Sequence, residues 1–266
     1  MNKASQAASE LRAMDALSAG NSPIHRLHPL AKLLTTILYI FLTVSFPKYS
    51  LSAMACMVLY PVFLFQASGI PVRTCFYKMR YVLPFVMAVG IVNPFLDRTP
   101  MLYLGRIPVS GGVISMLTLM LKGVFSLMAS FLLMATTKVD ALCAALHKLH
   151  VPKLLVSLFL LTCRYISVMV EQVSIMSNAY ALRAPGQKGI HISAWGSFLG
   201  QLLLRSIDKA GELFQSMQLR GFHGEFYYAG VKPWDRGDTA FTLISAVFLI
   251  FFRYVDIALL LGSLFV

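Results

Sequence analysis

Two helix ends that combine an arginine with a glycine carry the residue types best suited to bind a partner protein. The first is the run Ala-Leu-Arg-Ala-Pro-Gly at 181–186, and the second is Gln-Leu-Arg-Gly-Phe at 218–222. Glycine ends a helix at low cost because it adopts the left-handed conformation, which leaves Arg183 (with Gly186) and Arg220 (with Gly221) at exposed tips. A guanidinium presents five donors in a fixed geometry that suits carboxylates or backbone carbonyls. One such arginine is common because it balances the helix dipole, but two on consecutive helices favour docking.

Charged side chains also occur inside apolar segments, where each costs a few kcal/mol. Lys122 lies in one such segment, and Arg164 lies in another that is mostly apolar. Arg253 and Asp256 are three residues apart near the C-terminus, so on a helix they can pair with each other. These four residues either hold a helix bundle together or line a substrate path, and the sequence leaves both open.

Other chemistry has little support. The chain contains no GxxxxGK[ST] phosphate loop, no GxSxG or HExxH motif and no paired catalytic carboxylates, so we expect no enzymatic activity and no bound cofactor. Two histidine pairs, His25/His28 and His147/His150, have the spacing of two metal ligands on one helix face, but a proline follows each pair and no third ligand is adjacent. We therefore predict no metal site. The four cysteines are far apart and form no CxxC pair.

Composition indicates a membrane protein. The chain is 58% hydrophobic and 13% charged, whereas a soluble domain needs about a quarter charged residues to cover its surface. Lipid must therefore cover much of the exterior. The net charge of +12 comes from basic residues that lie between apolar runs, which is typical of membrane topology rather than nucleic-acid binding. No cleavable signal peptide is apparent, so the first span is expected to act as the insertion signal.

The apolar runs predict an all-α integral membrane protein with about five transmembrane helices. The predicted spans cover residues 33–46, 51–65, 81–95, 113–136 and 239–266. The first two are joined by a tight turn at 47–50, and the segment between the third and fourth predicts a short hairpin with a glycine turn. The corresponding regions are a cytoplasmic N-terminal segment (1–32), four helices (33–136), a cytoplasmic helical domain (137–238) and a final span (239–266).

The region 137–238 differs because it mixes apolar residues with regularly spaced charges. From 195 to 219 the apolar positions form a helical stripe, with charged residues on the other face. The stretch 151–184 is more apolar. We interpret both as long helices that lie under or partly within the membrane surface. A sixth span within 151–170 is the alternative.

Three stretches have the form of family motifs: the opening SPIHRLHPLAKLL (22–34), the helix with Val-Pro-Lys at 151–153 and Arg-Tyr at 164–165, and RSIDKAGELFQSMQLRGF (205–222). Together they resemble the transmembrane T component of energy-coupling factor (ECF) transporters, and most closely its cobalt-transport CbiQ-like branch. Three positions depart from the family pattern: Leu219 replaces an alanine, Pro185 stands where the first motif has arginine, and His28 stands where an acid is frequent.

This resemblance implies a non-catalytic subunit of an ATP-driven importer in the bacterial plasma membrane. Two cytoplasmic ABC ATPases would bind the helix tips and use the ATP, and a separate membrane S component would bind the substrate, a vitamin or a cobalt- or nickel-type ion. The rival interpretation is a secondary transporter that binds substrate among its own spans, which would require ionisable residues at the midplane and an inverted repeat. A membrane-embedded enzyme lacks a nucleophile with a base.

The distribution of basic residues predicts the topology. Of the 23 Lys and Arg residues, 18 lie in the N-terminal segment, the loop after the second span and the region 137–238, against 3 on the other side. We therefore expect reporter fusions to place the N-terminus in the cytoplasm and the C-terminus outside. If both termini were found on one side, either the last span or the non-spanning assignment of 137–238 would be wrong.

Overall fold

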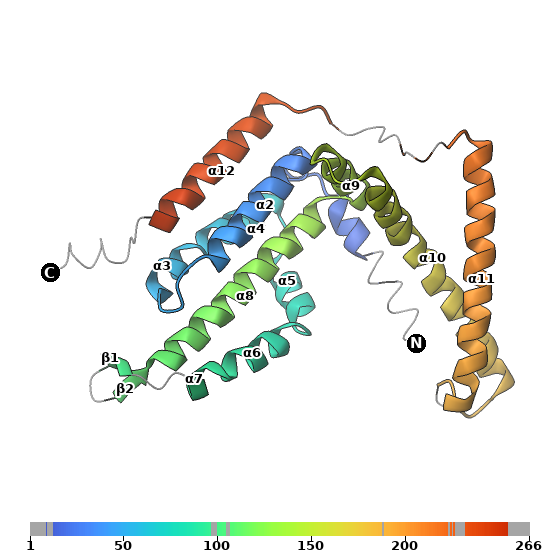
Figure 1. Cartoon of the computed structure of the whole chain (residues 1–266), viewed down its shortest axis with the longest axis horizontal. Helices are drawn as coiled ribbons and strands as arrows, with labels where there is room; N and C mark the ends of the chain where they lie inside the picture. The colour runs from blue at the N-terminus through green and yellow to red at the C-terminus, as the bar shows by residue number, and fades with distance from the viewer. Residues whose placement is uncertain are drawn as a thin grey trace. The chain divides into compact units, whose positions relative to one another are not determined.

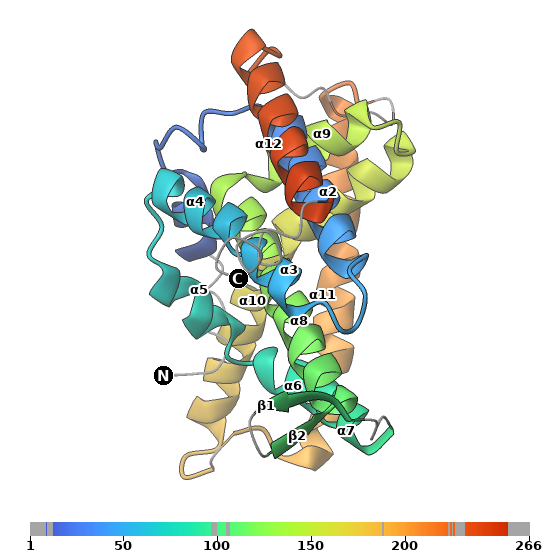
Figure 2. The same ribbon diagram turned by 90° about the vertical axis from the view of Figure 1, so that its left-hand side faces the viewer.

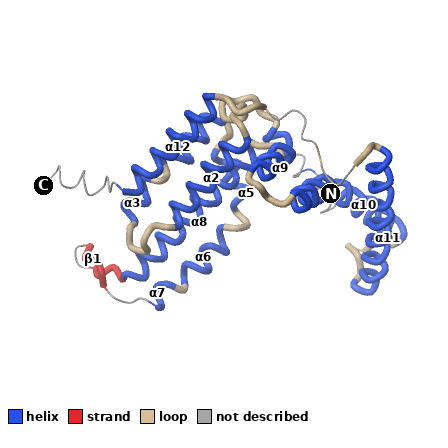
Figure 3. Tube along the Cα trace, turned by 45° about the horizontal axis from the view of Figure 1, so that its top comes forward, coloured by secondary structure: helices blue, strands red, loops and turns tan. Residues whose placement is uncertain are grey.

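The fold is helical apart from one short hairpin (Figures 1 and 3), which confirms the predicted all-α class. The structure is a computed structural model that describes residues 9, 13–96, 100–104, 107–187, 189–222, 224, 226 and 232–254. Its elements are α2 (Pro29–Val44), α3 (Leu51–Cys56), α4 (Leu59–Ser68), α5 (Val72–Met79), α6 (Leu83–Ile91), α7 (Asn93–Leu96), β1 (Pro100–Leu104), β2 (Ile107–Ser110), α8 (Gly111–Thr136), α9 (Val139–Lys148), α10 (Lys153–Arg183), α11 (Ile192–Leu219) and α12 (Arg236–Tyr254).

The chain packs as two compact units. Residues 17–138 and 232–266 form one, here called the bundle unit, and residues 1–16 and 139–231 form the other, here called the arm unit. The chain therefore passes from one unit to the other at three points, after residues 16, 138 and 231. This division describes packing alone, so the assignment of 1–32, 33–136, 137–238 and 239–266 to the membrane or the cytoplasm stays a prediction.

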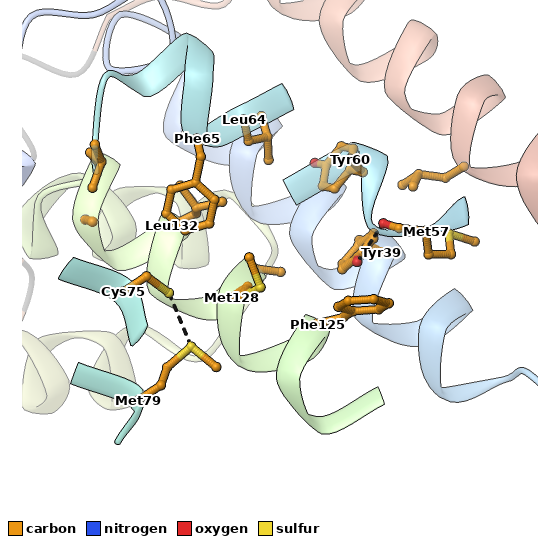
Figure 4. Close-up of a cluster of buried hydrophobic side chains, with 14 of the residues drawn as sticks. Tyr39, Met57, Tyr60, Leu64, Phe65, Cys75, Met79, Phe125, Met128 and Leu132 are labelled. Carbon is orange, nitrogen blue, oxygen red and sulfur yellow. Dashed lines mark hydrogen bonds between the residues drawn. The ribbon is translucent and has the colours of Figure 1, made fainter. Parts of the chain in front are cut away.

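Helix α2 lies against both α8 and α12 in the bundle unit (Figure 2). Half of the buried side chains in the cluster around it are aromatic residues or methionines, which lie between α2 and α5 in the sequence and in α8 (Figure 4). The rings of Tyr39 and Tyr60 stack at 4.8 Å between centroids, which joins α2 to α4. Because methionine is flexible and polarizable, it fills the irregular space between such rings.

The second predicted span, 51–65, is broken into α3 and α4. Pro61 has no N–H, so the carbonyl of Met57 loses the hydrogen bond that it would accept within a continuous helix. The hydroxyl of Tyr39 donates to this carbonyl at 3.1 Å (Figure 4), which satisfies it inside an apolar core. The predicted span therefore contains a break between Cys56 and Leu59. After Ser68 the chain turns by 117° into α5, which makes a broken span or a re-entrant loop.

The third predicted span, 81–95, is also interrupted. Helix α6 ends at Ile91 and the four-residue α7 begins at Asn93, because Pro94 cannot donate a hydrogen bond to the preceding turn. The fourth span is confirmed: α8 covers 26 residues, close to the predicted 113–136. The hairpin before it is confirmed too, since β1 and β2 pair antiparallel. Its predicted glycine turn lies outside the described residues.

Three of the described helices are long and apolar enough to cross a membrane: α8, α10 and α12. Helix α2, with 16 residues, is shorter than the ~20 that a perpendicular span needs. Helix α10, which the sequence analysis placed under or partly within the membrane, also has the length and apolar composition of a span, so both alternatives for this region stand. The last predicted span is described as far as Tyr254.

Glycine lets α6 approach α8 closely. A Cβ atom added to Gly123 would lie 2.6 Å from Cγ1 and 3.3 Å from Cγ2 of Val86. Valine is stiff about χ1, so its methyl groups cannot turn away. A Cβ added to Gly90 would lie 3.4 Å from the nearest atoms of Met116 and Met120, which is ordinary contact with flexible side chains.

We therefore expect Gly123→Ala to lower the free energy of unfolding, since overpacking costs about 1–3 kcal/mol. Gly90→Ala is the matched control: it gains the same helix propensity, up to about 1 kcal/mol, without the close contact. Thermal unfolding of the purified protein in detergent measures both. Equal or higher stability of Gly123→Ala relative to Gly90→Ala would contradict the close packing of α6 on α8.

Candidate functional site

The C-terminal end of α11 is closed by a glycine in the predicted way. Gly221 has φ of +77°, and its N–H donates to the carbonyl of Gln218 at 2.9 Å. The N–H of Phe222 donates to the carbonyl of Met217 at 3.0 Å, which completes a Schellman motif. The motif holds Arg220 at the position that ends the helix, where its side chain is exposed. This arginine is therefore presented on a fixed backbone.

The end of α10 is built differently. Arg183 is the last helical residue and is exposed, and Ala184 ends the helix with an N–H bond to the carbonyl of Tyr180. Pro185 and Gly186 then form a turn closed by the N–H of Gln187 on the carbonyl of Ala184 at 3.3 Å, with φ of +95° at the glycine. Proline followed by glycine is the combination that a type II turn requires. Gly186 thus belongs to the next turn, and it does not cap the helix.

The two arginine tips lie at opposite ends of α11. The chain reverses between α10 and α11, and Tyr180 binds Gln187 (3.0 Å) and His191 (3.4 Å) where it does so (Figure 1). A side-chain bond from Arg205 to Gln172 at 3.1 Å joins the two helices further along. Helix α11 has 28 residues, so at ~1.5 Å per residue its ends are roughly 40 Å apart.

A leucine precedes each arginine and is almost fully exposed: Leu182 is 84% exposed and Leu219 is 90% exposed. The sequence analysis noted Leu219 only as a departure from the family pattern and did not recognise Leu182. The repeated Leu-Arg dipeptide was the signal that could have identified both. Each tip therefore combines an apolar side chain with a cation, which suits a partner groove that offers an apolar pocket beside a carboxylate.

Much of the predicted apolar stripe on α11 is unburied. Phe198 is the one residue of this helix that is buried, whereas other members of the stripe are about half-exposed. These are Trp195, Leu199, Leu203, Ile207 and Phe214. An exposed apolar face of this size on a helix indicates contact with lipid or with another protein.

Lys122 and Arg253 meet at the C-terminal end of α2. The ammonium of Lys122, on α8, donates to the carbonyls of Val44 at 2.9 Å and Phe46 at 2.5 Å. The guanidinium of Arg253, on α12, donates to the carbonyl of Ser45 at 3.2 Å and lies 4.6 Å from the centre of the Phe46 ring. Cations at this position satisfy free carbonyls and oppose the helix dipole. This arrangement supports the structural interpretation of both residues.

The other two charged candidates stand apart from this cluster. Asp256 lies outside the described residues, so its pairing with Arg253 stays a prediction. Arg164 lies on α10 in the arm unit, where its side chain is exposed.

The histidines have structural partners. His28 is fully buried at the N-terminal end of α2, where its Nδ1 accepts a hydrogen bond from the N–H of Leu30 at 3.1 Å. An acidic side chain makes the same bond at many helix starts, which explains why histidine can replace the acid that is frequent in the family. His150 has φ of +62° and ends α9 in the conformation usually given to glycine. Among the described residues, no three His, Cys, Asp or Glu side chains gather closely enough to hold a metal ion.

A buried polar cluster that the sequence analysis did not foresee surrounds the start of α2. The ammonium of Lys32 donates to the carbonyl of Thr136 at 2.7 Å, at the last residue of α8. The backbone N–H of His28 donates to the carboxylate of Asp238 at 2.8 Å, in the first turn of α12. Helix α2 is thus bound to α8 and α12 by polar contacts at both of its ends. Asp238 could have been suspected from sequence only as an acid near a helix start.

Two curated relatives match parts of the chain. An uncharacterized protein of Methanocaldococcus jannaschii is 25% identical over 139 residues, which are 51% of this chain and 47% of that protein. The nickel permease LarQ of Lactiplantibacillus plantarum is 30% identical over 91 residues, which are 34% of this chain and 33% of the permease. The chain thus matches less than half of the length of each.

The match to a protein family is much longer. Residues 20–228 match CbiQ, the cobalt transport protein family, and this range runs from the polar cluster at the start of α2 through both arginine tips. The apolar helices of both units make a multi-pass membrane protein, as a transport component requires. The chain is therefore a membrane transport protein of the CbiQ family.

Proposed function

We propose that this chain is the membrane-spanning coupling (T) subunit of an ECF-type importer. Two cytoplasmic ATPases bind the arginine tips, and ATP-driven movement of the ATPases passes through this chain to a substrate-binding S component. The observation that carries the proposal is the pair of exposed Leu-Arg tips at opposite ends of α11. Arg220 ends α11 and Arg183 ends α10 before the turn that leads to the start of α11, so a separation of roughly 40 Å along α11 gives each of two globular ATPases its own docking point.

The chemistry of each tip fits this docking. A planar guanidinium forms two parallel hydrogen bonds with a carboxylate, and the adjacent leucine fills an apolar pocket. Because α11 is continuous over 28 residues, a displacement of one tip moves the whole helix. The tip at Arg220 has the better-defined backbone, since a Schellman motif holds it, whereas the tip at Arg183 leads directly into a turn.

The family and one relative support a proposal for the class of transported substrate. The family is described as cobalt transport proteins, and one relative is named a nickel permease. We infer that the importer takes up a transition-metal ion of this type, or a vitamin, and that the S component recognises it. In this arrangement α10 does not cross the membrane, so the N-terminus and both tips are cytoplasmic and the C-terminus is external, in accordance with the distribution of basic residues.

The rival interpretation, a secondary transporter, has less support. It requires ionisable residues directed at a central substrate path. Lys122 and Arg253 instead bind backbone carbonyls at the end of α2, which accounts for both cations without a substrate.

Arg220→Ala is expected to weaken the binding of the ATPases. Truncation of an interface arginine of this kind costs about 2 kcal/mol or more, which is roughly a thirtyfold loss of affinity. Arg183→Ala should have a smaller effect because its backbone is less firmly held, and Arg220→Lys should rescue only partly because an ammonium lacks the planar fork. Recovery of ATPases with the tagged chain from membranes measures this, together with uptake in the reconstituted complex.

Arg205→Ala provides the matched control, since Arg205 lies on the same helix away from its tip and binds Gln172 within the unit. We expect it to keep the ATPases. Normal assembly and uptake by the Arg220→Ala, Arg183→Ala double variant would show that the tips are ordinary helix ends and would refute the proposed function.

The purified chain alone should not hydrolyse ATP, because it lacks a phosphate-binding loop. Hydrolysis measured on the isolated chain and on the assembled complex tests this. Turnover by the isolated chain at the rate of the complex, with contaminating ATPases removed, would contradict the assignment of ATP use to partner subunits.

A further inference from the structure

The three points at which the chain passes between its two units have one feature in common. Near each point, a residue on the bundle side forms a hydrogen bond with a residue of the segment 25–32, at the start of α2. The residues concerned are Leu17, which begins the bundle unit, Thr136, which lies two residues before its end, and Asp238, which lies soon after its second beginning. All of the residues involved belong to the bundle unit.

The contacts are short and specific. Nε2 of His25 donates to the carbonyl of Leu17 at 3.0 Å, Nζ of Lys32 donates to the carbonyl of Thr136 at 2.7 Å, and the backbone N–H of His28 donates to Asp238 at 2.8 Å. Lys32 also donates to the carbonyl of His25 at 3.3 Å, so the three contacts form one cluster. We call the segment 25–32 with these three partners the anchor.

The anchor is buried, and it makes further polar contacts with its surroundings. Lys32 is 5% exposed, Asp238 is 1% exposed and His28 is not exposed. The second oxygen of Asp238 accepts a hydrogen bond from the N–H of Asp235 at 3.0 Å and lies 3.9 Å from the ammonium of Lys232. Buried, charge-assisted hydrogen bonds of this kind resist displacement more than neutral bonds at the surface.

The other end of α2 provides a natural comparison. Lys122 also binds two backbone carbonyls there, and Arg253 binds a third. These contacts hold the same helix to the same neighbours, α8 and α12. No point of passage between the units lies at this end, because Val44 and Phe46 are followed by the turn into α3. Lys32 and Lys122 therefore make similar hydrogen bonds. They differ because Thr136, a partner of Lys32, lies next to a point of passage between the units, whereas the partners of Lys122 do not.

We propose that the anchor is the part of the bundle unit that receives force from the arm unit. When the arm unit moves, its three connections to the bundle unit pull on Leu17, Thr136 and Asp238. Because the anchor binds these residues to α2, the movement displaces the whole bundle and does not merely deform the connections. His25, His28, Lys32 and Asp238 are then positioning residues for coupling. This inference rests on the proposed function, since it concerns how that coupling is carried.

The experiment compares two lysine variants in the complete complex. Lys32→Met and Lys122→Met each remove an ammonium that binds two carbonyls, so both should lower the thermal stability to a similar extent. His25→Phe is a milder second anchor variant, because it keeps a ring beside Gly20 and lies at a partly exposed position. For each variant the measurements are thermal stability, ATPases recovered with the tagged chain, ATP hydrolysis, and uptake of radioactive Co²⁺ and Ni²⁺ by proteoliposomes.

We expect all three variants to retain the ATPases and to hydrolyse ATP. Lys32→Met and His25→Phe should lower metal uptake per ATP hydrolysed by about tenfold, which is within the range measured for residues that carry coupling. Lys122→Met should keep the wild-type ratio despite its loss of stability. If Lys32→Met yields no folded protein, the comparison of His25→Phe with Lys122→Met decides.

Three results would overturn the inference, and they are distinguishable. An unchanged ratio of uptake to hydrolysis in the anchor variants, while Arg220→Ala still loses the ATPases, would reject the anchor and leave the proposed function standing. The same fall in the ratio for Lys122→Met would also reject it, because the effect would then follow from lost stability. If no ATPase accompanies the wild-type chain, the proposed function fails and the inference fails with it.

Discussion

The carbonyl groups left free at the C-terminal ends of α2 and α8 are bound by lysine and arginine side chains from neighbouring helices, and the bundle unit depends on these contacts. Each helix leaves four carbonyls without an internal partner, and in an apolar environment an unsatisfied one costs several kcal/mol. Lys32 supplies a donor at the end of α8, while Lys122 and Arg253 supply donors at the end of α2. The charges inside apolar segments are thus explained by the backbone that they satisfy, and the same bonds join α2 to its two neighbours.

Proline also leaves a backbone carbonyl without a donor within a helix, and a side chain from another helix again satisfies it. The break at Met57 frees a carbonyl because Pro61 has no N–H, and Tyr39 supplies the missing donor from α2. The stacked rings of Tyr39 and Tyr60 and the methionines around them then fill the space near the break. A short helix such as α2 can therefore organise the bundle, since Tyr39 satisfies the break between α3 and α4 and the two ends of α2 are bound to α8 and α12.

The arm unit differs from the bundle unit in how few of its side chains are buried. Its long helices bury few side chains, and its most exposed groups include the leucines at the two arginine tips. An exposed leucine contributes little burial to the isolated fold, and under the proposed function the ATPases cover the leucine at each tip. In the bundle unit, Lys32, Lys122 and Arg253 satisfy free backbone carbonyls, whereas the arm unit presents exposed leucine and arginine side chains, the groups that the proposed function assigns to partner binding. The start of α2 binds Leu17, Thr136 and Asp238, which lie near the three points at which the chain passes between the units.

Several features were predictable from local sequence. Apolar runs predicted α8 and the two long helices of the arm unit, and glycine after Arg220 predicted a left-handed helix end, because these depend on neighbouring residues alone. The opening motif, the Val-Pro and Arg-Tyr helix and the closing Arg-Gly indicated the family, which the match over residues 20–228 confirms. The breaks after Cys56 and Ile91 could have been suspected from Pro61 and Pro94, but the donor that satisfies the carbonyl of Met57, the hydroxyl of Tyr39, comes from another helix and is not apparent from local sequence.

The sequence by itself determined the helical class, the membrane character and the family, since composition and short motifs suffice for these. Only the tertiary structure decided what the buried charges do. Lys32 and Thr136 are 104 residues apart and His28 and Asp238 are 210 apart, and no local pattern indicates such pairs. Likewise, Lys122 and Arg253 could be read as a substrate path until the end of α2 was seen between them. A hydrogen bond between distant residues depends on how the helices pack, and packing is a property of the whole chain.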